Sequence, residues 1–223
     1  LPFATAWTME RDCMDDYLAE FRRLKEKYAD QIELVIGLEI DYLNEESHPG
    51  IPYFQKLPLD YRIGSVHMLY NPEGTIVDID TPADVYRGLV DTHFEGDLDS
   101  VIRLYYSRLR RMVELGGFDI VGHADKMHYN ASLYRPGLLD ESWYDLLVSD
   151  YFAEIARRQY IVEINTKAYH TLGTFYPNER YFPLFKELGI RVQVNSDAHY
   201  PERINSGRPE ALAALKTAGF DSV

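Results

Sequence analysis

Five short apolar segments, separated by longer stretches with helical periodicity, constrain the fold of this chain most strongly. The segments are 32–40 (IELVIGLEI), 61–69 (YRIGSVHML), 118–125 (FDIVGHAD), 160–166 (YIVEINT) and 190–195 (IRVQVN). Each is almost wholly apolar, as expected of strands that are buried on both faces of a sheet. Because such strands alternate with helices here, the sequence predicts a parallel α/β architecture in which helices cover the sheet.

Segments before, between and after these strands have the spacing of amphipathic helices. Apolar residues recur at every third or fourth position between Met9 and Tyr28, which predicts a helix with one buried face. Gly116 is expected to end another helix, and Asp140 to cap the start of a third. The further predicted helices cover residues 98–115, 140–159, 178–188 and 209–218.

Composition narrows the functional class. The chain has 223 residues, of which 46% are hydrophobic and 26% charged, which is typical of a soluble globular protein with one domain over residues 1–223. No apolar run approaches the ~20 residues that span a membrane, and the first residues do not resemble a signal peptide. The single cysteine, Cys13, excludes an internal disulfide. We therefore expect a cytoplasmic protein with no membrane partner.

The net charge of −13 counts against nucleic acid as a partner, because nucleic-acid binding depends on Lys and Arg displacing counterions. It does not exclude a small anionic substrate, because bound metal ions can reverse the potential inside one cleft.

Polar residues stand where the predicted strands end. In a parallel β/α barrel these ends converge on one face, which carries the active site. One such residue or pair follows each of the five strands in chain order, namely Glu39, His67, His123, Asn165, and Asp197 with His199.

Five of these residues have side chains that bind transition metals. Imidazole nitrogen and carboxylate oxygen are ligands for Zn, Mn or Fe, and a bridging carboxylate can hold two ions ~3.5–4 Å apart. Such ions make hydroxide available near neutral pH, so no nucleophilic Ser or Cys is required. The candidate metal ligands are Glu39, His67, His123, Asp197 and His199.

Taken singly, each candidate also fits a structural role. A lone His at a strand end is more often a satisfied polar residue than a ligand, and Asp197 fits the cap of a turn. Glu39 fits a solvated loop. The joint pattern favours the metal site, because four of five consecutive strand ends supply His, Asp or Glu.

A phosphorylated substrate would also need cationic or polar partners on this face. Lys167 and Arg203 are the preferred pair, because Arg grips phosphate in a bidentate manner and Lys offers a point charge. Each charge considered alone also fits a solvated loop. The remaining candidate substrate contacts are Asn165, Lys126, Arg135, His128 and His170.

The motifs GLEIDY, IGSVH, VGHADK, EINT and NSDAH, in this order and spacing, resemble the PHP (polymerase and histidinol phosphatase) superfamily, and within it the histidinol-phosphatase branch. The resemblance extends from about residue 32 to the end of the chain. It implies a distorted (β/α)7 TIM-like barrel, the PHP fold, with up to three divalent metals. It further implies a phosphomonoesterase that hydrolyses L-histidinol phosphate to L-histidinol and phosphate in histidine biosynthesis.

The same resemblance implies roles for single residues. Glu39 would bridge two metals, of which His67 and His123 would bind one. Asp197 would bind at the first metal and His199 at the third, so that Glu39, Asp197 and His199 would form the catalytic centre.

The sequence departs from the family pattern at its start. Family members begin with a strand that ends in His-x-His, whereas the first histidine here is His48. The opening LPFATAWT resembles the segment after the second strand of the family, so two strands and about four ligands are expected to be absent. Only the site of Glu39, His67 and His123 then keeps its expected set. The unpaired edges of such a barrel would favour a homo-oligomer.

Two other functions stay open from the sequence. One is another PHP phosphoesterase or an amidohydrolase-like metallohydrolase, because metal ligands specify a hydroxide better than its target. The other is a non-catalytic, truncated or ligand-binding domain. Metal content and activity would separate these alternatives.

Overall fold

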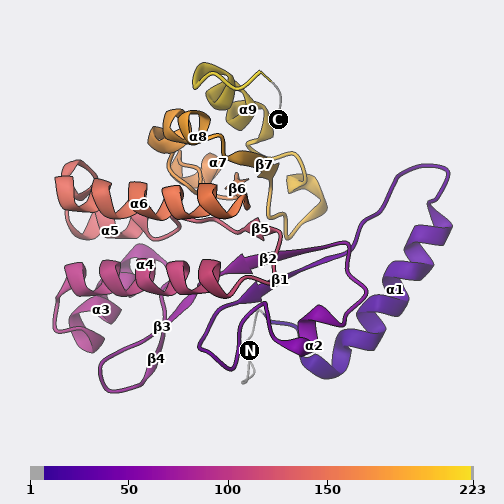
Figure 1. Cartoon of the computed structure of the whole chain (residues 1–223), viewed down its shortest axis with the longest axis horizontal. Coiled ribbons are helices and arrows are strands. Elements are labelled where there is room, and N and C mark those ends of the chain that lie inside the picture. The colour runs from indigo at the N-terminus through magenta and orange to yellow at the C-terminus, as the bar shows by residue number, and fades with distance from the viewer. Residues whose placement is uncertain (1–7, 222–223) are drawn as a thin grey trace.

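A parallel sheet of five strands forms the centre of the computed structural model, which describes residues 8–221. The strands are β1 (Gly37–Asp41), β2 (Tyr61–Ser65), β5 (Ile120–Val121), β6 (Ile161–Asn165) and β7 (Arg191–Asn195). They lie in chain order, and every neighbouring pair is parallel (Figure 1). The predicted parallel α/β architecture is therefore confirmed. Within residues 8–221, β1 and β7 are the two ends of the sheet, and the barrel is not closed. Residues 1–7, which include most of LPFATAWT, lie outside the described part.

The prediction of one continuous strand over 61–69 is wrong. β2 ends at Ser65, and β3 (Met68–Tyr70) pairs with β4 (Ile76–Asp78) in a separate antiparallel hairpin. The side chain of Asn71 accepts a hydrogen bond from the amide of Thr75 at 2.7 Å, and Gly74 takes the positive φ that this turn requires. The break places His67 in the connection directly after β2. The first predicted strand, over 32–40, is also shorter in the structure, where β1 begins at Gly37.

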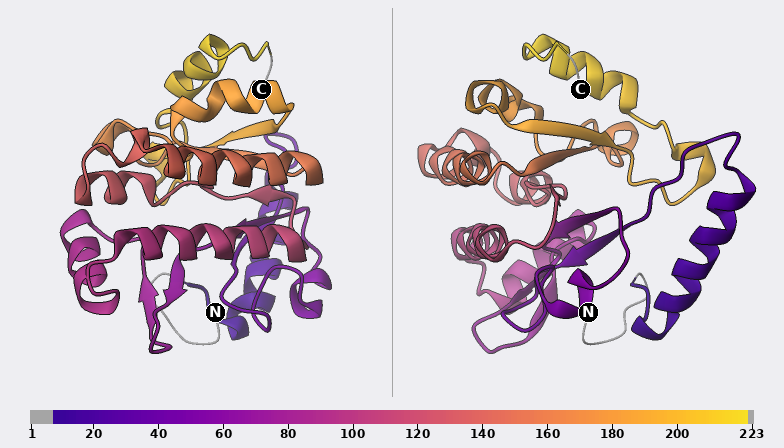
Figure 2. Two further views of the ribbon diagram at one scale, coloured as in Figure 1. Left: turned by 60° about the vertical axis from the view of Figure 1, so that its left-hand side comes forward. Right: turned by 45° about the vertical axis from the view of Figure 1, so that its right-hand side comes forward.

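Helices cover one face of the sheet and its edges. They are α1 (Met14–Lys27), α2 (Pro52–Gln55), α3 (Ala83–His93), α4 (Leu98–Leu115), α5 (His128–Tyr134), α6 (Ser142–Arg158), α7 (Tyr169–Leu172), α8 (Phe182–Leu188) and α9 (Arg208–Thr217). Short 3-10 turns cover Arg11–Cys13, Leu138–Asp140, Glu179–Tyr181 and Pro201–Arg203. α4 and α6 pack side by side, and α9 packs on β7, whereas α1 lies on the other side of the sheet (Figure 2).

Capping explains where the predicted helices begin and end. α4 has the predicted bounds, because the Asp97 side chain accepts a hydrogen bond from the Ser100 amide and Gly116 ends the helix. The prediction that Asp140 caps the next helix is wrong. Asp140 ends a 3-10 turn and pairs with Arg180, and α6 begins two residues later. α2, α3, α5 and α7 were not predicted.

The main core lies between the sheet and its helices. Val121, Val162 and Ile164 of the sheet pack there against fully buried aromatic residues such as Tyr151 and Phe152 of α6. A separate small cluster of Met14, Leu18 and Ile36 holds α1 to the start of β1. Among the described residues, no helix is both long and apolar enough to cross a membrane.

Candidate metal centre

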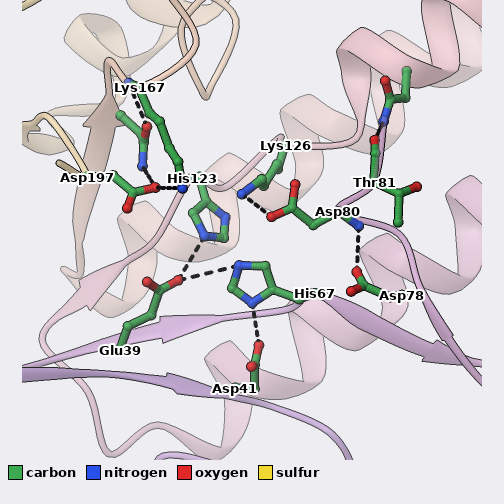
Figure 3. Close-up of polar contacts among 12 residues, drawn as sticks. Glu39, Asp41, His67, Asp78, Asp80, Thr81, His123, Lys126, Lys167 and Asp197 are labelled. Carbon is green, nitrogen blue, oxygen red and sulfur yellow. Dashed lines mark hydrogen bonds and ion pairs between the residues drawn. The ribbon is translucent and has the colours of Figure 1, made fainter. Parts of the chain in front are cut away.

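Three side chains from consecutive strands of the sheet meet at their carboxyl ends. Glu39 lies on β1, His67 follows β2 and His123 follows β5 (Figure 3). Glu39 Oε1 lies 2.8 Å from His123 Nε2 and 3.6 Å from His67 Nε2, and the two imidazole rings are 4.7 Å apart between centroids. The predicted convergence of these strand ends is thus present in the structure.

The three donor atoms have the spacing that a transition metal requires. All of them lie within 4.8 Å of one another. Donors placed 2.0–2.1 Å from a tetrahedral ion are about 3.3–3.4 Å apart, a value that falls between the two distances from Glu39. A carboxylate and two imidazoles are also a common ligand set for Zn. The residues present therefore fit a metal ion.

Asp41 fixes the orientation of His67. Its Oδ1 accepts a hydrogen bond from His67 Nδ1 at 2.7 Å, and the two side chains are only 12% and 10% exposed. Nδ1 therefore carries a proton. The other ring nitrogen, Nε2, faces Glu39. Burial disfavours the charged imidazole, but the charge and hydrogen bond of Asp41, together with the charge of Glu39, outweigh burial and raise the pKa of His67 to about 9.

The carboxylate of Glu39 is the most strongly stabilised anion of this cluster. Burial raises its pKa, but the hydrogen bond with His123 and the charges of His123 and His67 outweigh burial and hold the pKa well below its usual range. Glu39 is therefore ionised at neutral pH. The site has the electrostatic character of a cation-binding position.

Glu163 also belongs to this centre, although it was not predicted from the sequence. It lies on β6, is 4% exposed, and accepts a hydrogen bond from the backbone amide of His123 at 2.8 Å. Burial raises the pKa of this carboxyl. The signal in the sequence was an acidic residue inside the otherwise apolar strand IVEI, where an unpaired charge is costly.

Asp197 and Lys167 form an ion pair near the Glu39 group. Lys167 Nζ lies 3.2 Å from Asp197 Oδ2, and the same oxygen accepts a hydrogen bond from Asn165 Nδ2 at 3.3 Å. His199 is 61% exposed, and its Nδ1 contacts the Asp197 carbonyl oxygen at 3.0 Å. Asp197 and His199 are therefore near the Glu39 group without sharing its close cluster of donor atoms.

A cleft of about 280 Å³ connects the Glu39 group with the Asp197–Lys167 pair. The residues of the site that line it are Glu39, His67, Lys167, Asp197 and His199. A second hollow of about 240 Å³ shares Lys167, Asp197 and His199 with the cleft, and Arg203 lines it as well.

Asp80, which lies in the loop between β4 and α3, also lines the cleft and was not predicted from the sequence. Its carboxylate pairs with Lys126 at 2.6 Å, and although burial opposes ionisation, this ammonium group lowers the pKa of Asp80. The predicted substrate contact Lys126 is therefore at the cleft, but its charge is already engaged.

Comparison with known proteins identifies the family. The model of the PHP domain matches residues 6–167, which is well over half of the chain. The chain belongs to the PHP domain family. Two curated PHP relatives carry the name "Probable histidinol-phosphatase". The protein from Schizosaccharomyces pombe is 26% identical over 219 residues, covering 94% of this chain and 67% of its own. That from Deinococcus radiodurans is 27% identical over 229 residues, covering 97% and 77%.

Two solved structures share the fold of this chain. A protein assigned as a histidinol phosphatase, from Listeria monocytogenes, superposes with a TM-score of 0.79 at 22% identity, over 91% of this chain and 77% of its own. The histidinol phosphate phosphatase of Lactococcus lactis, solved with Zn, L-histidinol and phosphate, gives a TM-score of 0.65 at 19% identity, over 93% and 74%. At these identities the likeness concerns the fold.

Three predicted substrate contacts of this PHP chain lie away from the cleft. Arg135 pairs with Asp99 and Glu141 and does not line the cleft. His128 is buried, with its ring nitrogens next to the Asp125 carbonyl and Thr174. His170 accepts a hydrogen bond from the amide of Gly207. The structure gives these three side chains structural partners, so we remove them from the proposed substrate site.

Proposed function

We propose that this chain is a metal-dependent phosphomonoesterase that hydrolyses L-histidinol phosphate to L-histidinol and phosphate, a step of histidine biosynthesis. The observation that carries the proposal is the convergence of Glu39, His67 and His123 at the strand ends, where Glu39 and His67 line the same cleft as Lys167. The names of the curated relatives, and the Zn, L-histidinol and phosphate in the Lactococcus lactis structure, support this choice of substrate.

Glu39, His67 and His123 would hold one divalent ion, Zn, Mn or Fe, and the family pattern allows up to three with Asp197 and His199 as further ligands. When bound, the metal centre supplies hydroxide near neutral pH and stabilises charge on the phosphoryl oxygens. The chain's own residues orient this centre. Asp41 holds the ring of His67 in one tautomer, and Glu39 is ionised and ready to bind a cation.

Lys167 and Arg203 are the proposed phosphate contacts. Lys167 is 44% exposed in the cleft, so that its ammonium can leave Asp197 and reach a phosphate oxygen as a point charge. Arg203 lines the adjoining hollow together with Lys167 and would offer its guanidinium to the same phosphate. Asn165 keeps Asp197 in place while Lys167 changes partner.

The test is metal content together with substrate preference. The Zn-loaded, Mn-loaded and Fe-loaded proteins are assayed with L-histidinol phosphate, a nucleoside monophosphate, phosphotyrosine and an amide. We expect L-histidinol phosphate to have the highest kcat/KM. Glu39→Gln should lower kcat/KM by more than about 100-fold, because loss of an outer-shell partner alone costs roughly 10–100-fold.

Glu45→Gln is the matched control, because Glu45 pairs with Arg111 outside the cleft. It should leave both activity and metal content unchanged. A wild-type protein without bound transition metal, or a Glu39→Gln variant of full activity, would refute the proposed function. A higher kcat/KM for another substrate would leave the metal centre intact and replace the substrate.

A further inference from the structure

We propose that Glu163 is a positioning residue of the metal centre, whose buried carboxylate fixes the backbone of His123 directly and the side chain of Asp197 through Asn165. The inference rests on the proposed function only in requiring that the centre binds a metal. Glu163 lies behind the cleft and does not line it. It would therefore act through the residues that do.

Glu163 receives hydrogen bonds from three strand ends. Its Oε2 accepts from the His123 amide at 2.8 Å and from Asn165 Nδ2 at 3.2 Å, and its Oε1 accepts from Asn195 Nδ2 at 2.9 Å. His123 follows β5, Asn165 ends β6 and Asn195 ends β7. One buried side chain therefore sets the spacing of three neighbouring strand ends.

Two of the residues tied to Glu163 have a strained backbone. His123 has a φ of 23° and Asp197 a φ of 48°. Both values are in the left-handed region of the backbone, which residues other than glycine rarely adopt. Such conformations persist only where surrounding contacts enforce them. The hydrogen bond that the His123 amide donates to Glu163 stabilises the first of these strained conformations directly.

The second strained residue is reached indirectly. Asn165 Nδ2 contacts both Glu163 Oε2 at 3.2 Å and Asp197 Oδ2 at 3.3 Å. Asn165 also accepts a hydrogen bond from the amide of Lys167 through its Oδ1. A shift of Glu163 would therefore move His123 and the Asp197–Lys167 pair together.

Side-chain length and side-chain charge are separable at this position. Gln has the length of Glu, and its carbonyl oxygen can still accept from the His123 amide while the amide group of Asn195 turns over. Asp keeps the negative charge, but it is one methylene shorter and cannot reach the same amide. If Glu163 acts by position, Glu163→Gln should preserve the centre better than Glu163→Asp. If it acts by charge, the order should be reversed.

The experiment measures Zn²⁺ affinity of the chelator-stripped full chain by competition with a chromogenic chelator, and the visible spectrum of the Co²⁺-loaded form. We expect the dissociation constant for Zn²⁺ to rise about 10–100-fold in Glu163→Asp and clearly less in Glu163→Gln. The Co²⁺ spectrum should change in Glu163→Asp, because the geometry at His123 changes. Thermal melting of the metal-free variants reports any general loss of stability.

Asp119→Ala is the matched control. Asp119 Oδ2 accepts a hydrogen bond from the Arg62 amide at 2.8 Å, which is the same kind of bond between neighbouring strands, but at the amino ends of β2 and β5. This variant should lower the melting temperature without changing Zn²⁺ affinity. Wild-type Zn²⁺ affinity in Glu163→Asp, or weaker binding by Glu163→Gln than by Glu163→Asp, would overturn the inference. A wild-type chain that binds Zn²⁺ but does not hydrolyse L-histidinol phosphate would refute only the proposed substrate.

Discussion

Replacement of Asp41 by Asn tests whether the carboxylate behind His67 sets the charge of the imidazole. The variant keeps the shape of the side chain and removes its charge. In the metal-free protein, His67 has a pKa of about 9, against about 6.5 for an unperturbed histidine. A folded-state pKa that is raised in this way stabilises the fold fully below pH 6.5, and the stabilisation is lost as the pH rises through 9.

The size of the effect follows from the same values. The pKa difference of 2.5 corresponds to about 3.4 kcal/mol, of which Asp41 supplies the largest favourable part and Glu39 a smaller one. A buried hydrogen bond to a charged group is worth about 1.5–3 kcal/mol. We therefore expect Asp41→Asn to lower the free energy of unfolding of the metal-free protein by about 2 kcal/mol at pH 6, and by about 1 kcal/mol or less at pH 10.

Urea unfolding of the chelator-stripped protein at pH 6, 8 and 10 measures this difference. Asp60→Asn is the control, because Asp60 accepts a hydrogen bond from the Ile36 amide and contacts no imidazole. Its effect on stability should be similar at pH 6 and pH 10. The explanation of the His67 pKa is refuted if the loss caused by Asp41→Asn is equally independent of pH.

The remaining predictions concern the cleft and the core. Lys167→Ala should raise KM for the phosphomonoester about 10-fold or more and leave Zn²⁺ affinity within a few-fold, because Lys contributes a point charge to phosphate. Lys186→Ala, which loses an exposed pair with Asp221 and a contact with the Phe220 ring, should have wild-type kinetics. Phe152→Ala should cost about 3–5 kcal/mol of unfolding free energy in urea, because the buried ring packs on Phe185. Unchanged KM in Lys167→Ala, or a loss below about 1 kcal/mol in Phe152→Ala, would contradict the assigned contacts.

The order of the elements could be predicted from the sequence because it depends on local patterns. Apolar runs that alternate with amphipathic stretches specify the five parallel strands, and the spacing over Leu98–Leu115 specifies α4. The hairpin of β3 and β4 was missed because its first strand continues the apolar run of β2. The turn residues Asn71 and Gly74 in NPEG were the available signal.

The metal centre could be predicted in part for the same reason. Parallel strands bring their carboxyl ends together, so that Glu39, His67 and His123 meet whatever the details of packing. Charged loop residues follow no such rule. Arg135 and Lys126 were both placed at the cleft from their position after a strand, and only Lys126 lines it. The partner of each, Asp99 for Arg135 and Asp80 for Lys126, depends on loops whose course the periodicity does not encode.

The charges of the cleft predict an order of binding. The charged residues that line it in the metal-free protein are the acids Glu39, Asp41, Asp80 and Asp197 and the bases Arg11, Lys126, Lys167 and His67, whose raised pKa leaves it protonated beside Asp41. The bases are already engaged, because Arg11 lies over the ring of Tyr53 and the two lysines pair with Asp80 and Asp197.

A phosphate that enters the metal-free cleft therefore competes with the carboxylates for these bases and lies beside their negative charge. Each like-charge pair at 4 Å costs about 1–4 kcal/mol, depending on the local dielectric constant. Bound divalent ions add positive charge to the cleft, so phosphate affinity should depend on metal occupancy. Calorimetric titration with inorganic phosphate should give saturable binding to the Zn-loaded protein and none at millimolar phosphate to the stripped protein. Equal affinity in the two forms would show that the lysines alone bind the anion and that the metal centre takes no part in holding it.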